Sequence, residues 1–200
     1  MKHSRRALPA LMLRALGLAL IVAAAGAAPA SADVPAQVTG TELVSGKAFS
    51  ADLKSADAGS SQERVIVFLS SKCPCSRSHE PKLAALAREF TARGVEFIGI
   101  HANQDETEAE ARLHFKEAAL PFPVVRDTGA RLANAFGALK TPHAYILRGN
   151  EIVYQGGVDS SAMADEAKSF YLRDALLAVE QGRKPEPGMT RCLGCMIKRN

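Results

Sequence analysis

The sequence predicts an α/β protein whose mixed central sheet is covered by helices on both faces. Short apolar runs rich in valine and isoleucine alternate with segments whose apolar residues recur at helical spacing, a pattern typical of strands connected through helices. Two apolar segments around a Gly-Asn pair follow these units, and a last amphipathic segment comes after them. They predict a hairpin and a C-terminal helix.

The expected elements follow a leader over 33–39, which we expect to be mobile. Gly94, Gly137 and Gly182 stand where three of the helices should end, because glycine accepts the left-handed conformation that closes many helices. Pro81 falls inside the first helix and should kink it. In chain order we expect a hairpin over 41–49, a strand over 64–70, a helix over 74–93, a strand over 95–100, a helix over 105–119, a strand over 122–125, a helix over 128–136, a hairpin of strands 144–147 and 152–154, and a helix over 168–180.

The first 32 residues are expected to be a secretory signal peptide. Four basic residues precede an apolar segment over 15–28, and Ala30-Ser31-Ala32 has the small residues of a cleavage site. The apolar segment is too short for a comfortable membrane span. We therefore expect a periplasmic or secreted protein with no stable membrane insertion after the signal is cleaved.

Charge and length limit the remaining possibilities. The chain has 25 Lys and Arg and 21 Asp and Glu, and four of the basic residues lie in 1–32. The rest of the chain therefore has a formal net charge of zero, which does not predict a nucleic-acid partner. Its length suits one domain over 33–182, followed by a Pro/Gly-rich tail over 183–200 that contains a Cys-x-x-Cys motif.

Cys73 is the candidate nucleophile. It follows the apolar strand over 64–70 and precedes Pro74, a residue well suited to the first position of a helix. Cys73 should therefore be the N-cap residue, where unpaired amides and partial positive charge stabilise thiolate over thiol. Lys72 and Arg77 are candidates for favouring the thiolate further.

Five further motifs accompany this strand, cysteine and helix. They are Pro81 eight residues after Cys73, Thr141-Pro142 before the strand over 144–147, Phe122-Pro123-Val124-Val125-Arg126-Asp127 before Phe136-Gly137, Val153-Tyr154-Gln155-Gly156-Gly157-Val158-Asp159, and Gly194-Cys195-Met196-Ile197-Lys198 in the tail. Together they resemble the thioredoxin-like superfamily, nearest to its exported redoxin branch of TlpA-like thiol–disulfide oxidoreductases and AhpC/TSA peroxiredoxin-like proteins.

The resemblance implies a fold, an activity and a site. The fold would be a thioredoxin-like three-layer sandwich with a mixed central sheet, an N-terminal hairpin and an extended C-terminal tail. The activity would be thiol–disulfide exchange without a cofactor, with protein disulfides or a thiol electron donor as partners. Pro142 would be cis, and Thr141 would direct its backbone toward a substrate chain that lies across the Cys73 sulfur.

The resolving cysteine has two candidate positions. Ser76 stands where the resemblance would place the second cysteine of a Cys-x-x-Cys motif, and serine cannot resolve a mixed disulfide. Cys75 is the first candidate, although side chains at i and i+2 of a helix do not face each other, so its bond to Cys73 would be strained and oxidising. Cys192 and Cys195 are the second, since a Pro/Gly-rich tail can fold back; they can also pair with each other.

Two alternative functions stay open. A thiol peroxidase of the peroxiredoxin type would use Ser70 as the hydroxyl three residues before the cysteine, but Ile66 stands where that motif has proline and no arginine can be assigned. A copper-binding module is the other alternative, because Cys73, Cys75 and His79 provide soft ligands near one helix end. A free His79 on the helix surface is the simpler expectation.

Overall fold

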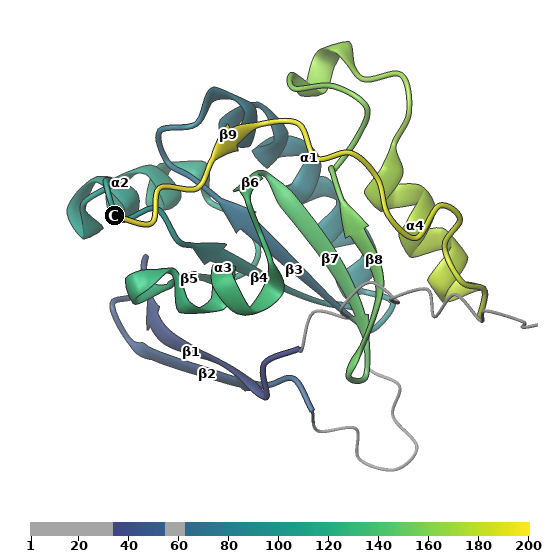
Figure 1. Cartoon of the computed structure of the whole chain (residues 1–200), viewed down its shortest axis with the longest axis horizontal. Coiled ribbons are helices and arrows are strands. Elements are labelled where there is room, and N and C mark those ends of the chain that lie inside the picture. Colours follow the sequence, from purple (N-terminus) through teal and green to yellow (C-terminus); the bar gives the residue numbers. More distant parts are fainter. Residues whose placement is uncertain (1–33, 55–62) are drawn as a thin grey trace, which may run out of the picture. The chain divides into compact units, whose positions relative to one another are not determined.

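The computed structural model describes residues 34–54 and 63–200 (Figure 1). The expected signal peptide over 1–32 lies outside the described residues. Within them, no helix is long and apolar enough to cross a membrane.

A mixed sheet of seven strands forms the centre of the described chain, in the order β2-β1-β5-β4-β3-β7-β8. β3 is parallel to β4 and β4 to β5, whereas β1 and β7 pair antiparallel with β5 and β3. The α/β class with a mixed sheet is therefore confirmed. The strands are β1 (Gln37–Glu42), β2 (Ala48–Asp52), β3 (Glu63–Leu69), β4 (Glu96–His101), β5 (Val124–Arg126), β7 (His143–Arg148) and β8 (Glu151–Gly156).

Helices cover both faces of the sheet (Figure 1). Leu83 and Phe90 from the first helix pack with Leu176 from the last one in one apolar cluster, and Phe136 from the third helix packs on Phe68 in the other. This gives the expected three layers. The helices are α1 (Pro74–Thr91), α2 (Glu108–Ala118), α3 (Arg131–Phe136) and α4 (Tyr171–Glu180), with short 3-10 turns at Thr128–Ala130 and Ala164–Glu166.

The N-terminal hairpin is longer than the sequence indicates. The leader expected over 33–39 is wrong in its last three residues, because β1 already begins at Gln37. β1 pairs with β2 along one edge and with β5 along the other, so backbone hydrogen bonds hold it on both sides. Its sequence contains Gly40, whose lack of a β-carbon admits the Arg126 carbonyl oxygen of β5.

The C-terminal tail returns to the end of the sheet where β3 leads into Cys73 and α1. In Figure 1 it is the yellow segment that runs from α4 over α1 toward the end of the chain. Its short strand β9 (Cys195–Met196) pairs antiparallel with β6 (Lys140–Thr141). The proline and glycine residues of the tail keep its first part irregular, as expected, but they do not prevent this pairing.

Candidate active site

Cys73 occupies the N-cap of α1, at the end of the loop that follows β3. Its backbone is extended, with φ −76° and ψ 116°, and Pro74 takes the first helical position. The Ser76 amide donates a hydrogen bond to the Cys73 sulfur at 3.5 Å, and the Arg77 amide donates to its carbonyl oxygen at 3.0 Å. The sulfur therefore faces the unpaired amides of the first helical turn, where a negative charge is favoured.

The loop between β6 and β7 lies against this sulfur. The Thr141-Pro142 peptide bond is cis, as the sequence motif predicts. The Cys73 thiol lies 3.3 Å from the Thr141 carbonyl oxygen, to which it can donate. The cysteine from the first half of the domain and the proline loop from the second half thus meet at one place.

The tail brings Cys195 close to Cys73 and to Cys75 in the first turn of α1. Cys195 is the register partner of Thr141 in the pairing of β9 with β6. The contact depends on Gly194, because a β-carbon there would collide with the Thr141 carbonyl oxygen. The sulfur atoms of Cys73, Cys75 and Cys195 all lie within 4.8 Å of one another.

The three thiols of this cluster differ in acidity. Burial opposes ionisation of Cys73, but hydrogen bonds from the Cys195 thiol and the Ser76 amide outweigh it and hold the Cys73 pKa below its ordinary value. Burial and the nearby Cys73 sulfur raise the pKa of Cys75. Burial and the hydrogen bond to Cys73 raise the pKa of Cys195 to about 12. Cys73 is therefore the sulfur that ionises first, with two thiols beside it.

Cys192 is not one of the three clustered sulfurs, although it contacts the proline loop. Its thiol donates to the Pro142 carbonyl oxygen at 3.0 Å, and burial raises its pKa to about 12. All four cysteines are free thiols in the structure. Of the two tail cysteines, Cys195 is the one whose sulfur lies in the cluster with Cys73.

The comparisons with known proteins decide the family. The model of the AhpC/TSA family matches residues 38–158, a stretch that begins in β1, ends just after β8 and includes both Cys73 and the proline loop. The chain belongs to the AhpC/TSA family. The tail with Cys192 and Cys195 lies beyond the matched residues.

Several solved structures are similar to this AhpC/TSA chain. An uncharacterized conserved protein from Geobacillus kaustophilus is 26% identical over 83% of this chain and 89% of its own, with a TM-score of 0.71. A hypothetical protein from Sinorhizobium meliloti is 24% identical, with coverages of 82% and 92% and a TM-score of 0.71. The thioredoxin domain of a thiol-disulfide oxidoreductase from Bacteroides vulgatus is 18% identical, with coverages of 64% and 89% and a TM-score of 0.52, and it shares the fold. No curated protein matches the sequence.

A buried carboxylate supports the cysteine loop of this AhpC/TSA domain, and sequence reasoning missed it. Glu106 accepts hydrogen bonds from the hydroxyls of Ser70 and Ser71, from the Ser71 amide and from Asn103. The Ser70 hydroxyl in turn accepts a hydrogen bond from the Cys73 amide at 3.0 Å. In the sequence, Glu106 follows an Asn-Gln-Asp run at the start of a predicted helix, where acidic residues are ordinarily solvated.

The Glu106 carboxylate is held ionised despite its burial. Its side chain is 2% exposed, and His101 lies 2.9 Å from it. Burial raises the pKa of Glu106, but hydrogen bonds from His101, Ser70 and Ser71 more than offset this and lower it to about 2. Arg126 continues the network, since its guanidinium lies 2.7 Å from the other ring nitrogen of His101.

His79 is not the free surface histidine that the sequence indicates. It is 1% exposed, and its two ring nitrogens lie 2.7 Å from the Cys75 carbonyl oxygen and 3.0 Å from Asp159. Lys82 pairs with the same aspartate. Because both nitrogens are already engaged inside the protein, His79 cannot join Cys73 and Cys75 as a metal ligand, and the structure places Cys195 beside them instead.

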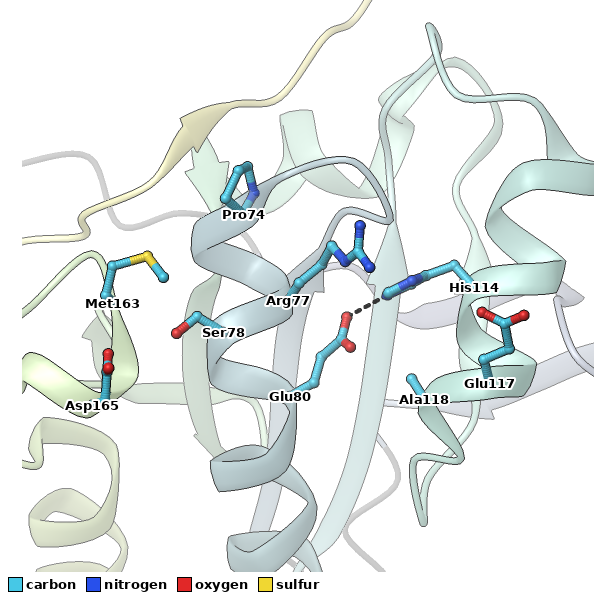
Figure 2. Close-up of a pocket in the computed structure, with 9 residues that line it drawn as sticks. All are labelled: Pro74, Arg77, Ser78, Glu80, His114, Glu117, Ala118, Met163 and Asp165. Carbon is cyan, nitrogen blue, oxygen red and sulfur yellow. Dashed lines mark hydrogen bonds and ion pairs between the residues drawn. The ribbon is translucent and has the colours of Figure 1, made fainter.

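Two cations expected near the nucleophile have other partners. Lys72 forms an ion pair with Glu110 at 3.1 Å and donates to the Asp105 carbonyl oxygen. Arg77 lines a hollow of about 530 Å³ beside the first half of α1 (Figure 2). The largest causes that lower the Cys73 pKa are hydrogen bonds from Cys195 and Ser76, and neither cation is among them.

The hollow begins at Pro74, the residue after Cys73, and has both polar and apolar lining residues (Figure 2). His114 on α2 lies 2.7 Å from Glu80 on α1 across its floor. Burial outweighs this contact and raises the pKa of Glu80. Met163 and Asp165 form the opposite wall (Figure 2). The hollow is thus a charged depression along α1 that extends to Pro74.

Proposed function

We propose that the chain is an exported thiol–disulfide oxidoreductase in which Cys73 is the nucleophile and a tail cysteine resolves. The observation that carries this proposal is the meeting of a low-pKa N-cap cysteine, a cis-proline loop and a second thiol at one place. Family membership and the fold shared with a thiol–disulfide oxidoreductase support it. Export rests on the signal-like residues over 1–32, which imply a periplasmic or secreted location.

The exchange would proceed in two steps. The Cys73 thiolate attacks one sulfur of a substrate disulfide, a mixed disulfide forms, and the second substrate sulfur leaves as a thiolate that takes up a proton. A resolving thiol then loses its proton and attacks the Cys73 sulfur. The substrate departs reduced, and the protein retains the new disulfide until a thiol electron donor reduces it.

Cys195 is the resolving cysteine that the geometry favours. Its sulfur lies within 4.8 Å of the Cys73 sulfur and its thiol helps to lower the Cys73 pKa, and it belongs to a separate segment that can adjust without disturbing α1. Cys75 is the other candidate and lies equally within 4.8 Å. Its bond to Cys73 would disrupt the first turn of α1, where the Ser76 and Arg77 amides bond to Cys73, because i and i+2 side chains diverge on a helix.

The tail also limits how a protein substrate reaches the nucleophile. Cys73 is 3% exposed, and β9 uses the backbone edge of Thr141 that would face an extended substrate chain. Opening this edge breaks the pairing of only two residues. We propose that a protein disulfide gains access when β9 separates from β6, while the tail remains anchored through the buried Ile197.

The test combines turnover with disulfide mapping. The reduced full chain is oxidised by a model protein disulfide, trapped with an alkylating agent and digested without reductant. A dominant Cys73–Cys195 link is expected, with turnover lost in Cys73→Ser and retained in Cys192→Ser. A dominant Cys73–Cys75 link would assign resolution to Cys75, and turnover that survives Cys73→Ser would overturn the proposal.

The geometry adds no support for the peroxidase alternative. The Ser70 hydroxyl, which would assist a peroxide, is occupied by the Cys73 amide and by Glu106. No arginine is among the groups that lower the Cys73 pKa. Rapid loss of the Cys73 thiol with hydrogen peroxide, absent in Cys73→Ser, is the result that would favour this alternative.

A further inference from the structure

We infer that Cys73, Cys75 and Cys195 form a binding site for a single Cu(I) ion in the reduced protein. The three sulfurs come from the N-cap of α1, its first turn and the tail strand β9, and all lie within 4.8 Å of one another. A disulfide needs two sulfurs, so the third is surplus to the proposed exchange reaction.

The spacing of the sulfurs suits one metal ion. Metal–thiolate bonds of about 2.3 Å place three sulfurs around an ion about 4 Å apart. The present separations need to shrink by less than roughly 1 Å, a movement that side-chain rotation of Cys75 and Cys195 supplies. Cys73 is held in place by Ser70 and Ser76 and serves as the fixed corner of the triangle.

The donor set selects for a soft ion. Within the described residues, no histidine nitrogen or carboxylate oxygen joins this group of three sulfurs. His79, the nearest histidine in sequence, is engaged by Asp159 and the Cys75 carbonyl oxygen. Three thiolates without a fourth ligand favour trigonal Cu(I), because structural Zn²⁺ is almost always held by four ligands.

The site is open enough to load and is held together by the fold. Cys73 is buried, Cys75 is half-buried and Cys195 is exposed, so an ion approaches from the tail side. The tail is anchored on both flanks of Cys195. Thr190 bonds to Tyr154 before it, and the Lys198 amide donates to Asn103 after it. The third ligand is therefore delivered by backbone contacts rather than by a free chain end.

Binding of Cu(I) changes the oxidation state of neither the copper nor the sulfurs. Cu(I) displaces the thiol protons to solvent, and the metal–sulfur bonds replace the sulfur–hydrogen bonds. A Cys73–Cys195 or Cys73–Cys75 disulfide removes two of the ligands, so the oxidised protein should not bind the ion. Copper binding and disulfide exchange would thus use the same sulfurs in mutually exclusive states.

The experiment titrates the reduced full chain without oxygen, using Cu(I) held by a chromogenic chelator. One equivalent should bind, and copper-edge X-ray absorption should count three sulfur ligands. Because losing even an outer-shell partner of a ligand costs about 10–100-fold in affinity, Cys75→Ser and Cys195→Ser should each weaken binding by roughly 100-fold or more. Cys192→Ser is the matched control and should bind like the parent.

Three results would overturn the inference. They are unchanged affinity in Cys195→Ser, two sulfur ligands in the parent protein, and tighter binding of Zn²⁺ than of Cu(I) in a parallel titration. Thermal unfolding of each variant without metal establishes that it folds. Disulfide turnover is measured separately, so a protein that exchanges disulfides but does not bind Cu(I) contradicts only the copper site.

Discussion

The buried carboxylate of Glu106 hydrogen-bonds to the hydroxyl of Ser70, which itself accepts the amide of Cys73. This relay connects the loop before α2 to Cys73 at the start of α1. The loop that contains Glu106 also contacts the returning tail, since the Gln104 amide donates to the Lys198 carbonyl oxygen at 2.8 Å. Asn103 links Glu106 to the tail, because its side chain donates to Glu106 and accepts from the Lys198 amide.

Glu106→Gln should lower the free energy of unfolding by roughly 3 kcal/mol, the range for breaking one side of a buried charged network. Whichever oxygen it replaces, the amide nitrogen of glutamine would face donors that now bond to Glu106, either those of Ser70 and Asn103 or those of Ser71. Chemical denaturation measures the loss. Glu117→Gln, on the exposed face of α2, should change stability by less than about 0.5 kcal/mol. Equal effects of the two variants would contradict this role.

The free energy of unfolding should depend on pH through the ionisation of Glu106. Its pKa is about 2 in the folded protein and about 4.3 when unfolded, so the unfolded state takes up the proton first as pH falls. The stabilisation is complete above about pH 5 and is lost as pH falls toward 2. The stability difference between the parent and Glu106→Gln should thus be constant near neutrality and shrink in acid. A difference that stays flat to pH 3 would show that Glu106 is not held ionised.

Local chemistry explains why the sequence predicts the N-cap position of Cys73 correctly. The N-cap placement of Cys73 depends only on the preceding strand and on Pro74, and the structure has both. The alternating strands and helices are confirmed for the same reason, since their periodicity is carried by neighbouring residues.

Partners from distant segments explain what the sequence does not reveal. His79 is buried because Asp159, far along the chain, meets it, and nothing near His79 indicates this. Glu106 is buried because Ser70 and Ser71 close over it. The arrival of Cys195 opposite Thr141 depends on strand pairing between the tail and β6, and tertiary pairing of this kind has no local pattern.

Cys195→Ala should raise the pKa of Cys73, because the thiol that hydrogen-bonds to the Cys73 sulfur is removed. The rate of alkylation of Cys73, followed peptide by peptide with mass spectrometry, should then reach half of its plateau at a higher pH. Cys195→Ser keeps a donor and should restore the shift in part. Cys192→Ala, which removes a thiol outside the cluster, is the control. An identical profile in Cys195→Ala and the parent would exclude this contribution.

Gly194→Ala should detach β9 from β6. A β-carbon at this position collides with the Thr141 carbonyl oxygen, and its φ of +157° is one that residues with side chains rarely adopt. We expect faster alkylation of Cys73 and faster hydrogen exchange in β9, with little change in the sheet. Gly188→Ala lies in the same tail, where the nearest atom to a new β-carbon is 3.4 Å away, and should leave both rates near those of the parent. The rates are compared on the high-pH plateau of each protein, where Cys73 is fully ionised and loss of the Cys195 contact does not affect them. An unchanged plateau rate in Gly194→Ala would mean that the tail does not shield Cys73.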